Sequence, residues 1–248
     1  MAEKINSVED LDHAGAARLV VDFFHRIVMH YAFWFTEIRH QMGTSRALDI
    51  LDAASSKSMT NQLKRLSKKL GFELRDGLPA ALMDLPKEEL VDLADTLATN
   101  WLANDGIWFQ AVEFTNGMND AKRCNDSCWA HFSPFEAWSI RKLLKLSDRP
   151  GLDGLKTALG FRLYSRINRQ SIVSEQPDSF IFQMNECRVQ AARKRKGLED
   201  YACKSVGLVE YPYFARSVDP RITTECIGCP PDKHPDHWYC AWRFSLSA

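Results

Sequence analysis

The chain has 248 residues, 45% of them hydrophobic, which is enough to bury a core in one large domain or two smaller ones. Basic and acidic residues balance at 32 each, so no overall field draws the chain to nucleic acid or to an anionic membrane. Residues 2–12 are too polar for a secretory signal, and the apolar stretch 20–35 carries too many charges to cross a membrane. We therefore expect a cytoplasmic protein without nucleic-acid or membrane partners.

Residues 1–165 are predicted to be helical. Apolar residues recur every three or four positions between residues 11 and 28, which predicts a buried helix face. Pro86, followed by acidic residues, predicts the start of another helix. Ser133 and Glu136 have the spacing of a capping box, so a third helix is predicted to begin there.

A weak internal repeat relates residues 34–78 to residues 108–152. Each copy predicts a helix, a glycine stop, a short helix and a third helix. Two explanations stay open: a duplicated module that encloses a pocket between its copies, or chance agreement between helical patterns. A shift of 74 residues pairs Trp34 with Trp108, Phe35 with Phe109, Ile38 with Val112, Gly43 with Gly117, Ala47 with Ala121, Leu70 with Leu144, Gly77 with Gly151, and Leu78 with Leu152.

Residues 166–248 combine strand and helix patterns, unlike the helical residues before them, and predict an α+β domain. Residues 170–175 and 179–184 predict a hairpin, with its turn at Pro177 and Asp178. Helices are expected over residues 185–196 and 206–218, the second broken or kinked by Pro212, and strands over residues 221–227 and 237–246. The predicted fold class is thus α+β, with a helical N-terminal portion and a small cysteine-rich domain.

The cysteines give the main functional signal. Their odd number, without an export signal, favours metal or redox chemistry over a disulfide framework. Cys226 and Cys229 form a C-x2-C turn that can present two thiolates to one ion, Cys240 lies on the following strand, and Cys203 or Cys187 can supply a fourth ligand. The alternative is a set of buried, inert thiols. The seven cysteines are Cys124, Cys128, Cys187, Cys203, Cys226, Cys229 and Cys240.

Residues 224–229 and 238–244 together resemble the closing signature of the 4-vinyl reductase domain. In zinc-containing members 22 residues lie between a first cysteine ligand and the second, as between Cys203 and Cys226 here. The resemblance implies zinc or, as an alternative, a [4Fe–4S] cluster. This sequence departs from the family by having Cys226 where those members use a carboxylate, and by a longer turn with two prolines. The implied ligands are Cys203, Cys226, Cys229 and Cys240, with Cys187 as a spare or alternative.

A second resemblance covers most of the chain. Residues 187–211, continued to the Cys-Pro-Pro at residues 229–231, resemble an uncharacterised family of cytosolic proteins from anaerobic lineages. That family is related to L-2-amino-thiazoline-4-carboxylate hydrolase-like proteins. The resemblance brings no established activity.

Two further groups of residues are candidates for a pocket or a second site. Cys124, Cys128 and His131 would share one helix face, either as metal ligands or reactive thiols, or as small buried residues beside a capping histidine. Glu113 follows Trp108 in an apolar helix, where it would act as an acid or base with a raised pKa or simply face solvent.

The sequence therefore predicts a metal-binding protein with a four-cysteine site and a pocket for a hydrophobic or aromatic small molecule. The alternative is a metal-dependent enzyme, either an amide- or thiazoline-type hydrolase or an iron–sulfur redox protein. A small-molecule ligand is the expected partner, and a homodimer is also considered.

Overall fold

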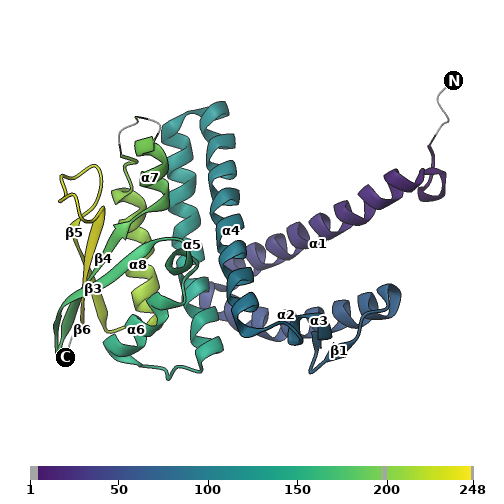
Figure 1. Ribbon diagram of the computed structural model, residues 1–248, viewed down its shortest axis with the longest axis horizontal. Coiled ribbons are helices and arrows are strands. Elements are labelled where there is room, and N and C mark those ends of the chain that lie inside the picture. Colours follow the sequence, from purple (N-terminus) through teal and green to yellow (C-terminus); the bar gives the residue numbers. More distant parts are fainter. Residues whose placement is uncertain (1–4, 196, 198–199, 247–248) are drawn as a thin grey trace. The chain divides into compact units, whose positions relative to one another are not determined.

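Long helices and two small antiparallel sheets make up the chain, as the computed structural model shows (Figure 1). The structure describes residues 5–195, 197 and 200–246. The chain divides into two units, Met1–Asp84 and Leu85–Ala248. The predicted α+β class is confirmed. Within the described ranges, every helix is too short or too polar to cross a bilayer.

The first unit is built mainly from two long helices. After the 3-10 turn η1 (Val8–Asp10) come α1 (His13–Met42) and α2 (Thr44–Leu70), and then β1 (Leu74–Arg75), β2 (Leu78–Pro79) and α3 (Ala80–Met83). Asp12 caps α1 by accepting a hydrogen bond from the amide of Gly15. The prediction of a buried face on α1 is wrong, because none of its residues is buried. The buried apolar residues described in this unit are Ala47, Leu48 and Ala80.

The second unit holds the larger core. Its helical elements are α4 (Lys87–Asn116), α5 (Met118–Leu144), α6 (Gly151–Gly160), η2 (Leu163–Arg166), α7 (Arg188–Arg195) and α8 (Lys204–Val218). The start of α4 directly after Pro86 is confirmed, and α8 continues through Pro212. The predicted last residue of the helix over 185–196 lies outside the described residues.

The two long helix pairs have matching lengths. Helices α1 and α4 each have 30 residues, and α2 and α5 each have 27 residues. Gly43 (φ 83°, ψ 165°) joins the first pair and Gly117 (φ 92°, ψ 167°) joins the second. Only glycine readily adopts this backbone region, so each glycine allows one long helix to turn into the next. The predicted further break in each copy is wrong, because α2 and α5 are both unbroken.

Helix α5 runs through the position where a new helix was predicted. Pro134 lies inside α5, and both Ser133 and Glu136 are buried rather than placed at an N-terminus. The predicted capping box is therefore wrong. A proline costs one backbone hydrogen bond in a helix. Here the packing of α5 on α8 and the pairing of the Glu136 carboxylate, described below, outweigh that cost.

The four-stranded sheet has the order β3 (Arg169–Gln176), β4 (Ser179–Glu186), β6 (Cys240–Leu246) and β5 (Ile222–Gly228), with every neighbour antiparallel. The predicted β3–β4 hairpin is confirmed. Along β4 the side chains of Phe180, Phe182 and Met184 alternate into the core. Figure 1 shows α8 between this sheet and the α4–α5 pair. The change in sequence pattern near residue 165 thus marks the start of the four-stranded sheet, which lies inside the second unit.

Candidate ligand cavity

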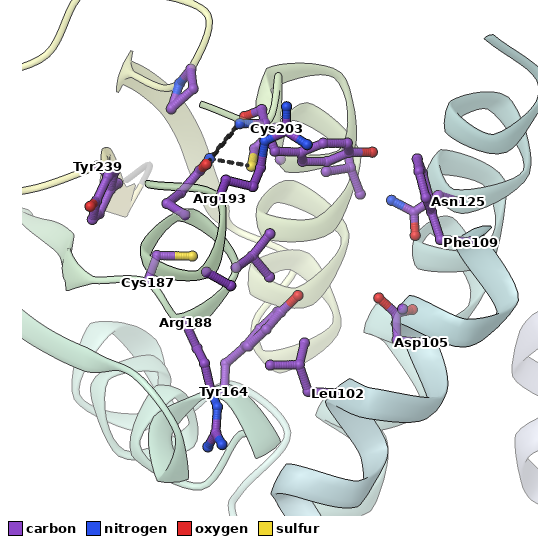
Figure 2. A pocket seen from close by; sticks show the side chains of 18 of the residues that line it. Leu102, Asp105, Phe109, Asn125, Tyr164, Cys187, Arg188, Arg193, Cys203 and Tyr239 are labelled. Atoms are coloured by element: carbon purple, nitrogen blue, oxygen red, sulfur yellow. Dashed lines mark hydrogen bonds between the residues drawn. The ribbon is translucent and has the colours of Figure 1, made fainter. Parts of the chain in front are cut away.

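A cavity of about 590 Å³ lies within the second unit. Its walls come from α4, α5, α7, α8 and the ends of β4 and β6, and all of its lining residues belong to Leu85–Ala248. Figure 2 shows side chains from these elements converging on the space. Most of the wall is apolar, as in small-molecule sites generally. Its aromatic lining residues are Phe109, Phe114, Trp129, Tyr164, Tyr201, Tyr211 and Tyr239.

A buried group of two carboxylates and one guanidinium supports one wall. Arg162 donates from Nε to Glu136 Oε2 at 2.8 Å, and the amide of Leu163 donates to Glu136 Oε1 at 3.0 Å. Arg162 Nη2 lies 2.8 Å from Glu210 Oε1, without the alignment of a hydrogen bond. Burial opposes the charge on Arg162, but the two carboxylates outweigh it and raise the Arg162 pKa above its ordinary value. Arg162 therefore stays charged and ties η2 to α5 and α8.

Aromatic rings enclose this guanidinium. The Arg162 Cζ atom lies 4.6 Å from the ring centre of Phe214 and 5.6 to 5.8 Å from those of Tyr211, Trp129 and Tyr164. Such contacts favour a cation inside an apolar core. The rings also connect the buried charges to the cavity wall, because Trp129, Tyr164 and Tyr211 line the cavity.

Three carboxylates line the cavity, those of Asp105, Glu113 and Glu210. Burial raises the pKa of Glu210 despite the opposing effect of Arg162, and Glu136 and Asp105 raise it further. Burial also raises the pKa of Asp105, which lies on α4. In Figure 2 the Asp105 carboxylate and the Tyr164 hydroxyl point toward each other across the cavity. The deep part of the cavity thus combines aromatic rings with acidic groups.

Thiols form another part of the wall. Cys187, Cys203, Cys229 and Cys240 all line the cavity, whereas Cys226 on β5 does not. Gln190 Nε2 donates to Cys203 Sγ at 3.2 Å. Burial raises the pKa of Cys187 to about 11 and that of Cys203 well above its usual value. Cys229 and Cys240 are hydrogen-bonded to each other, which lowers the pKa of Cys240 and raises that of Cys229.

The metal prediction requires a correction. Among residues 5–195, 197 and 200–246, no group of three or more His, Cys, Asp or Glu side chains is arranged to hold a metal ion. The cysteines are all free thiols, and burial raises the pKa of Cys187 and Cys203 and so favours their protonated form, whereas a metal binds the thiolate. The description of the chain as a metal-binding protein of the zinc or iron–sulfur type is therefore wrong. Spacing in the sequence alone did not show that Cys226 would lie outside the cavity wall that Cys203, Cys229 and Cys240 line.

Comparison with known proteins places the chain in a family. Residues 83–246, about two thirds of the chain, match a family described as a family of unknown function, DUF6125. The chain belongs to the DUF6125 family. No curated protein matches this DUF6125 member. The comparisons show no link to the 4-vinyl reductase domain or to thiazoline-carboxylate hydrolases. The matched region contains all of the cavity's lining residues and excludes α1 and α2.

The remaining predicted site residues of this DUF6125 member lie in several places. Glu113 lines the cavity, but Trp108 is exposed and points elsewhere on α4. Cys124 and Cys128 on α5 are exposed, as is His131, and none of these three lines the cavity. The second site predicted from their spacing therefore has no metal-holding arrangement within the described residues.

Sequence reasoning missed Asp105, Arg162 and Glu210. Arg162 and Glu210 come together only through the packing of η2 against α8, which no local pattern records. One signal was available for Asp105. It is an acidic residue between Leu102 and Phe109 on a predicted apolar helix face, and a charge on such a face is a reason to look for a pocket.

Proposed function

We propose that the Leu85–Ala248 unit binds a small, mainly aromatic molecule in this cavity. The observation that carries the proposal is a space of about 590 Å³ with aromatic and thiol walls and a few polar groups. Cavities of roughly 300–1,000 Å³ with this lining are typical small-molecule sites. The volume suits a molecule of one to three fused rings with a polar substituent.

A substitution at Gly106 can fill the cavity without destabilising the fold. It lies on α4 and lines the cavity, and an added Cβ would meet no atom within 4 Å. We expect Gly106→Leu to fill the space and weaken ligand binding by more than about tenfold. Because glycine is unfavourable inside a helix, the same change should raise the free energy of unfolding by about 0.5–1 kcal/mol. Saturation-transfer NMR with a library of aromatic fragments measures the binding.

Gly160→Leu is the matched control. Gly160 also lies in a helix with open space around an added Cβ, but it does not line the cavity. Fragments that bind the natural protein should bind Gly160→Leu equally and Gly106→Leu weakly. Equal binding to both variants, or no fragment binding to the natural protein, would contradict the proposal.

We also propose that the α1–α2 hairpin pairs with the same hairpin of a second copy, forming a four-helix bundle. The argument comes from the matched α4–α5 pair. Ala98 on α4 is completely buried, whereas its counterpart by the 74-residue shift, Phe24, is 45% exposed. Ile27 and Val28 are exposed too, although their counterparts Trp101 and Leu102 are half-buried. Such an apolar face on α1 suits a symmetric, self-complementary interface.

Phe24→Lys should convert the dimer into monomers, because it places a charge at the centre of this face. Size-exclusion chromatography with light scattering measures the change in mass. Phe33→Lys is the control, since Phe33 is also exposed but lies nine residues on, at two and a half helical turns, and so on the opposite side of α1. A monomeric natural protein, or equal dissociation in both variants, would refute the pairing.

A further inference from the structure

The charges around the cavity do not balance at its deep end. Glu136, Arg162 and Glu210 together carry two acidic groups and one basic group, all buried. Glu210 is 5% exposed, lines the cavity, and its Oε1 atom makes no aligned hydrogen bond. The group therefore presents an excess of negative charge to the cavity rather than to water.

Asp105 adds a second unbalanced carboxylate. It makes no hydrogen bond or ion pair with any residue that the structure describes, and burial is the whole cause of its raised pKa. A nearby guanidinium or ammonium group would have lowered that pKa. An unpaired carboxylate at a desolvated position is costly, which makes it a feature to be explained by a ligand.

Within the described residues, no basic side chain on or beside the cavity wall pairs with Asp105. Arg188 is exposed and donates to the Thr99 hydroxyl at 3.3 Å. Figure 2 shows Arg193 near Cys203, at the end of the cavity away from Asp105, and it has interactions of its own. Lys122 donates to the Ala202 carbonyl at 2.6 Å and lies over the Tyr201 ring. Arg195, the third arginine of the lining, is exposed at the end of α7, and none of these four cations forms an ion pair with Asp105.

We propose that the bound molecule is an arylalkylamine, an aromatic ring with an aliphatic amine substituent, whose ammonium group lies between the carboxylates of Asp105 and Glu210. This inference rests on the proposed small-molecule function and names the ligand class. The ammonium group donates to both carboxylates and restores charge balance. The Tyr164 hydroxyl and the faces of Tyr164 and Trp129 complete its surroundings, because aromatic faces attract cations. The aromatic part of the ligand occupies the apolar remainder of the cavity.

Three indoles of similar size and different charge test the inference: tryptamine as the cation, tryptophol as the neutral analogue and indole-3-acetate as the anion. Isothermal titration calorimetry at pH 7 should show tryptamine binding about ten- to a hundredfold more tightly than tryptophol, with indole-3-acetate weakest. Asp105→Asn should reduce the affinity for tryptamine to near that for tryptophol and leave tryptophol binding unchanged. Asp92→Asn, an exposed change on the same helix, should alter neither affinity.

The stability of Asp105→Asn is a second readout that needs no ligand. Removing an unpaired, desolvated carboxylate should raise the Tm by roughly 2–4 °C at pH 7, whereas Asp92→Asn should leave it unchanged. Asp105→Asn would thus stabilise the free protein and weaken its binding of tryptamine. A merely structural role for Asp105 does not produce this combination.

The outcomes separate the two proposals. Equal affinity for tryptamine and tryptophol, or a tryptamine preference that survives Asp105→Asn, overturns the cationic ligand while the cavity remains a binding site. If none of the three indoles binds the natural protein, both proposals fail.

Discussion

Replacing Arg162 with methionine is expected to destabilise the second unit by about 3–5 kcal/mol, enough to leave much of it unfolded at 37 °C. The methionine fills a similar volume, so the loss comes from two carboxylates, Glu136 and Glu210, that remain buried without a cation. Urea denaturation followed by circular dichroism measures the free energy of unfolding.

The loss of stability in Arg162→Met should be smaller at acidic pH. Without Arg162 the pKa of Glu210 rises further, because the cation that opposes the effect of burial is gone, so the folded state binds a proton more tightly than the unfolded state. Stability then falls as the pH rises through this pKa. The deficit of Arg162→Met should therefore be larger at pH 7.5 than at pH 5, and adding Glu136→Gln and Glu210→Gln should restore part of the stability.

Arg166→Met is the matched control. Arg166 also pairs with a carboxylate, that of Asp95, but its side chain is 42% exposed. An exposed ion pair contributes about 0–1 kcal/mol, so the control should change stability little. If both arginine variants lose the same stability, the buried charge group does not support the fold as described.

Gly207→Ala is expected to have the second-largest effect, a loss of about 1–3 kcal/mol. An added Cβ on Gly207 would lie 2.5 Å from Cζ2 of Trp242. Trp242 is completely buried and stacks on Tyr211 at 4.7 Å between ring centres, so it cannot move aside without repacking the core. The glycine allows α8 to approach β6 closely.

Gly106→Ala makes the same chemical change in another helix and should have the opposite sign. Its Cβ meets open space, so the change should add about 0.5–1 kcal/mol by helix propensity alone. Denaturant titrations of both variants measure the difference. Destabilisation of similar size in the two variants would show that the contact with Trp242 does not control the result.

The elements that the sequence predicted well are those whose signal is local. Alternation along β4 placed Phe180, Phe182 and Met184 on one face, and Pro86 marked the start of α4. These features depend on spacing within a few residues, and tertiary packing did not override them.

The predictions that were wrong concern contacts between residues that lie far apart in the sequence. Glu136 has the spacing of a capping residue from Ser133, yet its partner is Arg162, 26 residues later, and the helix continues through Pro134. The apolar repeat of α1 predicted a buried face, but no residue of α1 is buried, because a repeat does not show whether another element packs on that face. The cysteine spacing predicted a shared ion, whereas the fold keeps Cys226 off the cavity wall.

Methyl NMR of methionine tests the central claim, that the cavity binds a small aromatic molecule, most directly. Met118 and Met184 line the cavity, whereas Met29, Met42, Met59 and Met83 do not. In protein labelled with 13C at the methionine methyl groups, tryptophol should shift the signals of Met118 and Met184 and leave those of Met29, Met42, Met59 and Met83 in place. Unchanged signals of Met118 and Met184 at saturating tryptophol would contradict the account.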